Sequence, residues 1–286
     1  MQSICFFASY FTANKLPYYL TVYLKELKKH YSEVVFLCSQ NELQESDLEF
    51  FGSLNIQLVF EKNEGFDFGL WYKAFLKYDV NSYDRVALVN DSCILFKPLD
   101  EFMEWVDSND ADIKGMTRSD SIAPHLQSYF LVLNKKAVKE TDIYFLNHKI
   151  LDNITDVITT YEVGLSTHLI SKGLKIAAFI DNNGYSGEFS PYYYCVDYHI
   201  INGIPLIKKK ILFSTYRKDE LFTLARMNFN ISKKYYIDLI QKNNKKLIID
   251  FDKLALEKEI KQLNIFSVIK HLVISTLVKV KKIFKN

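Results

Sequence analysis

Residues 3–39, SICFFASYFTANKLPYYLTVYLKELKKHYSEVVFLCS, decide the fold class. The apolar runs 3–8 and 33–39 have the length and composition of buried strands. Between them, residues 16–30 carry apolar side chains at helical spacing. Two fully apolar strands joined by a helix predict two parallel strands in a sheet that is covered on both faces.

The same alternation continues to residue 90 and becomes less regular after it. Further helices are expected at 43–51 and 67–78, and further strands at 55–60 and 84–90. After residue 90 the sequence predicts strands at 110–117, 126–134 and 173–180, and a helical stretch at 151–172. Strands that alternate with helices predict an α/β fold with a mostly parallel, Rossmann-like central sheet flanked by helices.

Composition limits the class of protein and its partners. The chain has 286 residues, of which 49% are hydrophobic and 24% charged, so it can bury a large core. Its 36 Lys and Arg nearly balance 34 Asp and Glu, which gives no basic footprint for nucleic acid. Cys5, Cys38 and Cys93 lie in apolar runs without a C-x-x-C spacing, as free core cysteines do. With no basic leader and no run of 18 uncharged apolar residues, we expect a cytoplasmic protein.

The end of the chain differs from the rest. No Gly or Pro occurs after Pro205, which favours helices. We therefore predict a catalytic domain at 1–215, a helical extension at 216–262 and a basic amphipathic helix at 263–286. Residues 260–286 hold six lysines and no acidic residue, a composition that suits an anionic membrane surface. The alternative is a terminal helix that packs on the core or on a partner.

Polar residues follow each strand of the first third, at Ser9-Tyr10, Ser39-Gln40, 63–65 and 90–92. Because the carboxyl ends of parallel strands meet at one edge of the sheet, these groups could face a common crevice where ligands bind. The alternative is that strands simply end in polar residues.

Two of these segments carry more specific chemistry. Residues 63–69, NEGFDFG, open a helix, with a glycine for a tight turn and a carboxylate in the first turn. Asp91 in NDS (90–92) could ligate Mg²⁺ or Mn²⁺ that bridges a diphosphate. Each segment could also be only a helix start or an Asx turn. Glu162, near the start of a helical stretch, is a candidate general base or a residue that complements the helix dipole.

Common catalytic motifs are absent from the sequence. There is no G-x-G-x-x-G after the first strand, no Walker A loop, no G-x-S-x-G and no H-E-x-x-H. Their absence weakens assignments to dinucleotide-binding proteins, nucleoside triphosphatases and the common hydrolases.

Six segments in order resemble one protein family. They are NEGFDFGLW (63–71), VNDS (89–92), DADIKGMT (110–117), HLQSYF (125–130), YEVGLS (161–166) and GIPLIK (203–208). Over residues 3–212 the chain resembles the rhamnan synthesis protein F family of bacterial glycosyltransferases. The resemblance implies a glycosyltransferase-A type fold, a nucleotide-sugar donor and a role in the assembly of rhamnan, O-antigen or capsule.

The resemblance also assigns roles to residues. Asn63, Gly65, Asp67 and Gly69 would contact the nucleotide; Asn90, Asp91 and Ser92 would stand in place of an Asp-x-Asp motif; and His125, Gln127 and Ser128 would line the sugar site. Glu162 would be the catalytic base. Because Asp91 is the one carboxylate of its motif, a Mn²⁺ or Mg²⁺ cofactor could be replaced by a cation such as Lys208 or Arg118.

These inferences predict an inverting glycosyltransferase. The donor sugar would be rhamnose if the family name applies, and the acceptor would be a glycan or lipid-linked glycan at the inner face of the plasma membrane. The alternative is a non-catalytic subunit of an assembly complex that binds a sugar nucleotide or a glycan. A nucleotidyltransferase is disfavoured because no glycine-rich basic loop follows the first strand.

Overall fold

A central β-sheet organises the chain. The computed structural model describes residues 1–212 except 12, 40–41, 121 and 182–195. Within these residues eight strands join in the order β3-β2-β1-β4-β8-β6-β7, with β9 paired to β6. The strands are β1 (Ser3–Ser9), β2 (Glu33–Cys38), β3 (Gln57–Phe60), β4 (Arg85–Asn90), β6 (Ile113–Ser119), β7 (His125–Leu126), β8 (Phe130–Asn134) and β9 (Ile176–Ile180).

Within the eight-stranded sheet, four of the seven strand pairs are parallel. β1 pairs in parallel with both β2 and β4, β2 with β3, and β6 with β9. β8 is antiparallel to β4 and β6, so it enters the sheet from the edge at which β4 leaves it. The predicted α/β class with a mostly parallel central sheet is confirmed.

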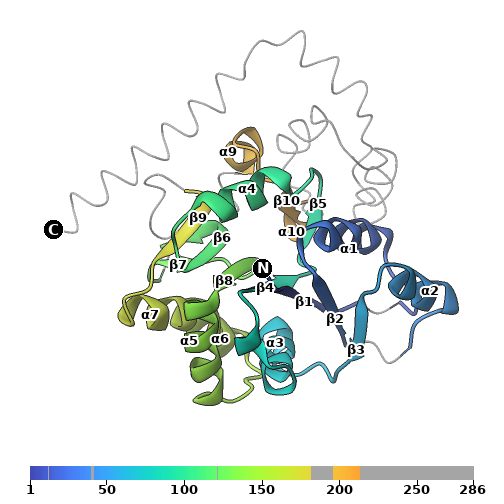
Figure 1. Cartoon of the computed structure of the whole chain (residues 1–286), viewed down its shortest axis with the longest axis horizontal. Helices are drawn as coiled ribbons and strands as arrows, with labels where there is room; N and C mark the ends of the chain where they lie inside the picture. Colours follow the sequence, from blue (N-terminus) through green and yellow to red (C-terminus); the bar gives the residue numbers. More distant parts are fainter. Residues whose placement is uncertain (12, 40–41, 121, 182–195, 213–286) are drawn as a thin grey trace, which may run out of the picture.

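Helices cover both faces of the sheet (Figure 1). One face carries α1 (Tyr18–His30), α2 (Glu45–Ser53) and α4 (Asp100–Ser108), and the other carries α3 (Phe66–Lys77), α5 (Lys135–Leu146) and α7 (Gly164–Ser171). Alternate residues of each strand serve the two cores. Phe7 stacks on Phe36 with ring centroids 5.6 Å apart on the α1 side, whereas Phe6 packs on the α3 side. Burying one such ring stabilises the fold by about 1.5–3 kcal/mol.

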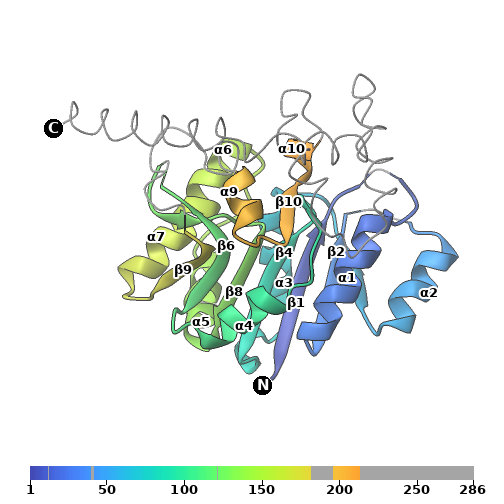
Figure 2. The ribbon, with the colours of Figure 1, turned by 90° about the horizontal axis from the view of Figure 1, so that it is seen from above.

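Two segments that lie far apart in the sequence pair with each other on the α1 side of the sheet. β5 (Cys93–Leu95) pairs antiparallel with β10 (Leu206–Lys208), which lies between α9 (Val196–Ile201) and α10 (Lys209–Leu212) (Figure 2). The backbone N–H of Lys209 donates to the carbonyl of Ser92 at 2.8 Å. This pairing places the residues around 208 against the segment that follows β4. Cys5, Cys38 and Cys93 are free and buried, as predicted.

The structure corrects the prediction of one strand over 126–134. β7 and β8 are separate, and residues 127–129 leave the ladder between them. From Gly115 to Arg118 β6 advances three residues, while its partner runs five residues from Leu131 back to Leu126. The two extra residues form a bulge that interrupts the strand predicted over 126–134.

The helical stretch predicted at 151–172 is confirmed, with one local difference. It consists of α6 (Ile154–Val157), a π-helix (Ile158–Val163) and α7. The π-helix contains Glu162, and such widened turns are frequent at functional sites.

Some predictions fall on other parts of the chain. The extension at 216–262 and the basic helix at 263–286 lie outside the described residues, so the domain boundary near 215 stays a prediction. Among the described residues, no helix combines the length and the apolar character that a membrane span requires.

Candidate functional site

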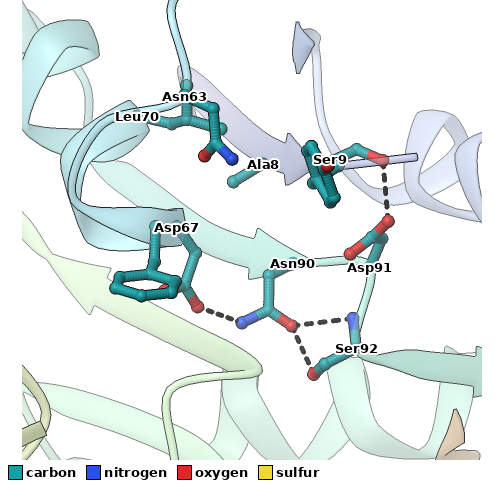
Figure 3. Close-up of a pocket in the computed structure, with 10 residues that line it drawn as sticks. Ala8, Ser9, Asn63, Asp67, Leu70, Asn90, Asp91 and Ser92 are labelled. Atoms are coloured by element: carbon teal, nitrogen blue, oxygen red, sulfur yellow. Dashed lines mark hydrogen bonds between the residues drawn. The ribbon is translucent and has the colours of Figure 1, made fainter. Parts of the chain in front are cut away.

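A cavity opens at the carboxyl ends of β1 and β4. Its volume is about 380 Å³. It is lined by Ala8, Ser9, Tyr10, Asn63, Phe66, Asp67, Leu70, Asn90, Asp91 and Ser92 (Figure 3). Three segments that the sequence analysis expected at a common crevice therefore meet there, because parallel strands end at the same edge of the sheet.

The turn at 63–69 depends on its glycines. Gly65 has φ +71°, a left-handed conformation that side chains rarely adopt. At Gly69 an added Cβ would lie 1.7 Å from the carbonyl oxygen of Glu64, so the backbone approaches too closely for any side chain. Phe66 also has a positive φ, +58°, although it carries a large side chain that is 42% exposed at the cavity. Strain of this kind costs about 1–3 kcal/mol and is concentrated at functional sites.

Asn90 links the two sides of the cavity floor. Its Nδ2 donates to Asp67 Oδ2, and its Oδ1 accepts from the backbone N–H of Ser92 at 3.1 Å and from Ser92 Oγ at 2.6 Å (Figure 3). Burial raises the pKa of Asp67 to about 6, against the hydrogen bond from Asn90, and the nearby charge of Glu162 raises it further. Asp67 therefore keeps its proton to a higher pH than an exposed aspartate does.

Asp91 points away from Asn90 and Ser92. Its Oδ2 accepts from Ser9 Oγ at 2.9 Å and lies 3.5 Å from the ammonium nitrogen of Lys209 (Figure 3 shows the contact with Ser9). Burial raises the pKa of Asp91, while the charge of Lys209 opposes that shift. No sequence motif points to Lys209, because its approach to Asp91 depends on the pairing of β10 with β5 across more than a hundred residues.

The expected sugar-site residues lie in β7 and in the bulge that follows it. The backbone N–H of Ser128 donates to Glu162 Oε1 at 3.2 Å. Gln127 Oε1 accepts from Thr117 Oγ1 at 3.0 Å, and His125 Nδ1 lies 2.7 Å from the carbonyl of Ala123. His125, Gln127 and Ser128 are buried. In the part of the chain that the structure describes, these three residues and Glu162 are not among the residues lining the cavity.

The two cations proposed from the sequence have other contacts. The Lys208 ammonium lies 5.5 Å from the ring centroid of Tyr129, and Arg118 forms an ion pair with Asp120 at 2.9 Å. Neither residue lines the cavity in the described residues. Lys209, the next residue after Lys208, is the one that reaches Asp91.

Residues 90–92 fit a divalent metal ion poorly. Mg²⁺ and Mn²⁺ favour several oxygen ligands, chiefly carboxylates and waters. Asp91 is the one carboxylate of the three residues, and its Oδ2 is already held by a hydroxyl and faces an ammonium. The Asn90 side-chain oxygen accepts two hydrogen bonds from Ser92.

Another group of side chains could hold a metal ion. Glu26, His30 and Asp100 offer three ligand atoms within 4.8 Å of one another. His30 belongs with Met1 and Ser3 to a cavity at the amino ends of the strands, the edge opposite to Asp91. Glu26 Oε1 already accepts from the backbone N–H of Leu99 at 2.9 Å, just before α4. This group is therefore separate from the cavity at Asp91.

Several solved structures resemble the chain at low sequence identity. A proposed nucleotide-diphospho-sugar transferase from Desulfovibrio desulfuricans is 11% identical with a TM-score of 0.41, over 85% of this chain and 99% of that one. A cytidylyltransferase from Leptospira borgpetersenii is 13% identical with a TM-score of 0.40, over 69% and 87%. The glycosyltransferase GlyE of Streptococcus pneumoniae is 14% identical with a TM-score of 0.39, over 91% and 63%. These likenesses are too distant to assign an activity.

Sequence comparison gives a clearer relationship. No curated protein sequence is significantly similar to the chain. A family model described as rhamnan synthesis protein F matches residues 34–280, which include the 63–69 turn, residues 90–92, Glu162 and Lys209. The match covers most of the chain, which therefore belongs to the rhamnan synthesis protein F family.

Proposed function

We propose that this chain is a glycosyltransferase that moves a sugar from a nucleoside-diphosphate donor to a glycan hydroxyl in the synthesis of a bacterial surface polysaccharide. The observation that carries the proposal is the cavity at the carboxyl ends of β1 and β4, lined by residues of 63–69 and 90–92, which lie within the range that the family model matches. Ligands of open α/β sheets bind at this edge. The family name supports rhamnose as the sugar and rhamnan, O-antigen or capsule as the product.

The proposed roles follow the arrangement of the cavity. The donor nucleotide would occupy the space between Asn63 and Asp91, where Tyr10 and Phe66 offer exposed aromatic rings. Aromatic rings of this kind provide stacking surfaces for a base. The sugar would extend toward Asn90 and the bulge at 127–129, beyond which lies Glu162. His125, Gln127 and Ser128 would shape that side of the site from within the sheet.

The proposed reaction is a single displacement. The acceptor hydroxyl oxygen bonds to the anomeric carbon, the bond between that carbon and the diphosphate oxygen breaks, and the nucleoside diphosphate leaves with the electron pair. The hydroxyl proton passes to the Glu162 carboxylate, since an alcohol is a poor nucleophile until a base takes its proton. Attack opposite the leaving group gives inversion. The Mn²⁺ or Mg²⁺ ion that the resemblance implies at Asp91 stays a prediction, and no step is assigned to it.

Glu162→Gln tests the catalytic role. The amide keeps the size of the side chain and can accept the hydrogen bond from the N–H of Ser128, so donor binding should persist. We expect turnover to fall by about 100-fold or more, since a positioned base contributes on that order. Release of nucleoside diphosphate from a panel of UDP-, GDP- and dTDP-sugars measures turnover. Transfer at the wild-type rate by this variant would contradict the assignment of the base.

The same assay separates the proposal from its alternative, a non-catalytic subunit that binds a sugar nucleotide or a glycan. The single carboxylate at residues 90–92 favours the alternative, because many transferases use two. A subunit of this kind would bind the nucleotide sugar and release no nucleoside diphosphate, even with acceptor present.

The proposed place of action is the inner face of the plasma membrane. The acceptor there would be a lipid-linked glycan, and the basic segment 263–286 would attach the protein to anionic lipids. This part of the proposal rests on the composition of the segment, which lies outside the described residues.

A further inference from the structure

Lys209 occupies an unusual position beside the cavity. Its ammonium nitrogen lies 3.5 Å from Asp91 Oδ2, donates to the hydroxyl of Tyr19 at 3.0 Å, and sits 5.1 Å from the centroid of the same ring. Its own backbone N–H is bonded to the carbonyl of Ser92. Contacts from α1 and from the residues that follow β4 thus converge on Lys209, whose side chain is only 24% exposed. Such convergence holds a positive charge next to Asp91, a residue that lines the cavity.

The Lys209 ammonium is paired with Asp91, the carboxylate that the resemblance assigns to a metal ion. Asp91 lines the cavity, and its Oδ2 holds both the Ser9 hydroxyl and the Lys209 ammonium. For a divalent cation to bind that oxygen, the ammonium would have to move away from it, because two cations at one oxygen repel. The Asp91 carboxylate therefore holds Lys209 through the oxygen that also accepts from Ser9.

We infer that the Lys209 ammonium, held by Asp91 and Tyr19, neutralises the diphosphate of the donor, so that nucleotide binding and transfer need no divalent cation. The inference rests on the proposed function, which supplies the diphosphate. A lysine is a compact charge on a flexible four-carbon stem, so its ammonium can turn from Asp91 to a phosphate oxygen. When the bond to the anomeric carbon breaks, negative charge grows on the leaving diphosphate, and a cation in contact with the diphosphate stabilises it.

The other described cations near this edge are less suitable. Lys208 packs over Tyr129, and Arg118 is paired with Asp120. Lys210 is exposed and follows Lys209 in the short helix α10, so it offers a matched control for the loss of one lysine charge.

Calorimetric titration of the purified chain with UDP, GDP and dTDP tests the inference. The diphosphate that binds tightest should bind in EDTA within about threefold of its affinity in Mn²⁺. Lys209→Met should weaken its binding by about tenfold or more, as expected for a charge-assisted contact to phosphate. Binding of the corresponding monophosphate should change less, Lys209→Arg should restore part of the affinity, and Lys210→Met should bind like the wild type.

A second variant guards against misfolding. Lys209→Met leaves the Asp91 carboxylate buried without its cation, whereas the double variant Asp91→Asn/Lys209→Met removes both charges. The double variant should unfold at the wild-type temperature and still bind the diphosphate weakly.

Two results would overturn the inference while leaving the proposed function intact. In the first, EDTA abolishes diphosphate binding and Mn²⁺ restores it. In the second, both variants that lack Lys209 bind the diphosphate with wild-type affinity. Failure of every nucleotide to bind, with or without Mn²⁺, would overturn the proposed function and this inference together.

Discussion

Asp67 carries its charge at a cost to stability. Its ordinary pKa is 3.8, and burial raises the pKa in the folded protein to about 6. The folded state therefore binds this proton more tightly than the unfolded state. The contribution of Asp67 to the free energy of unfolding rises as the pH falls from 6 toward 4, and it is lowest above pH 6. Asp67 lines the cavity, and among the described residues no ion pair offsets the burial of its carboxylate.

Asp67→Asn should therefore stabilise the protein at pH 8. The gain should be about 1–3 kcal/mol in the free energy of unfolding, because one pKa unit corresponds to about 1.4 kcal/mol. The gain should shrink as the pH approaches 4, where the wild-type carboxyl is protonated. Urea unfolding at pH 8 and pH 5 measures both effects.

Asp110 provides the opposite control. It is exposed, and its hydrogen bond with Lys175 lowers its pKa, so its charged form is favoured in the folded state. Asp110→Asn should give no gain at pH 8. Equal gains from the two substitutions would contradict the assignment of the effect to burial of Asp67.

Residue-level prediction from the sequence succeeded where neighbours in the sheet are set by simple rules. Ser9, Asn63 and Asp91 meet because parallel strands end at one edge, which the order of apolar runs reveals. Lys209 was missed because its position depends on β5 pairing with β10, and neither short strand has a periodic signal of its own. The left-handed backbone of Phe66 was equally hidden, since nothing in its side chain favours that conformation.

At the scale of elements, the start of α3 is the most constrained feature of the site. Gly69 backs directly onto the carbonyl of Glu64, and its N–H donates to the carbonyl of Gly65 at 2.8 Å. A methyl group at residue 69 would push the turn away from the helix, and that turn carries Asn63 and Asp67 into the cavity. The helix start and the shape of the site are thus coupled.

Gly69→Ala should consequently destabilise the protein and weaken nucleotide binding. We expect a loss of about 2 kcal/mol or more in the free energy of unfolding, typical of forced overpacking and backbone strain. Gly52→Ala in α2 is the matched control, because no atom lies within 4 Å of its added Cβ. That control should gain about 0.5–1 kcal/mol from the better helix propensity of alanine. Thermal unfolding measures the stability of both variants. Equal changes in stability would contradict the close approach of Gly69 to the Glu64 carbonyl.

Elements after residue 90 were harder to predict than those before it. α5 was not predicted, although Asn134 caps it by accepting from the N–H groups of Lys136 and Ala137. Its buried residues recur at helical spacing, but lysines and acids surround them. The run 126–134 looked like one strand because the bulge between β7 and β8 contains ordinary strand residues. Long-range pairing with β6, and not local preference, decides where β7 ends and where β8 begins.

For the whole molecule, charge is distributed unevenly along the chain. The six lysines of residues 260–286 leave 30 Lys and Arg against 34 Asp and Glu in the preceding residues, a net charge of −4. A net negative charge on residues 1–259 would be repelled by anionic lipids, so membrane attachment requires a local source of positive charge. The six lysines are the natural candidates, at about 1 kcal/mol of attraction each near a lipid surface.

We expect weaker membrane binding when three lysines of this segment are replaced by Gln, namely Lys279, Lys281 and Lys282. Binding to vesicles that contain anionic phospholipid should fall by about 100-fold, which corresponds to about 3 kcal/mol. Lys135, Lys136 and Lys139, three exposed lysines of α5, provide the control with the same change in net charge. Co-sedimentation with anionic and with neutral vesicles measures the difference. If the segment instead packs on the core or on a partner, the two triple variants should sediment alike, because net charge alone would then govern the weak attraction.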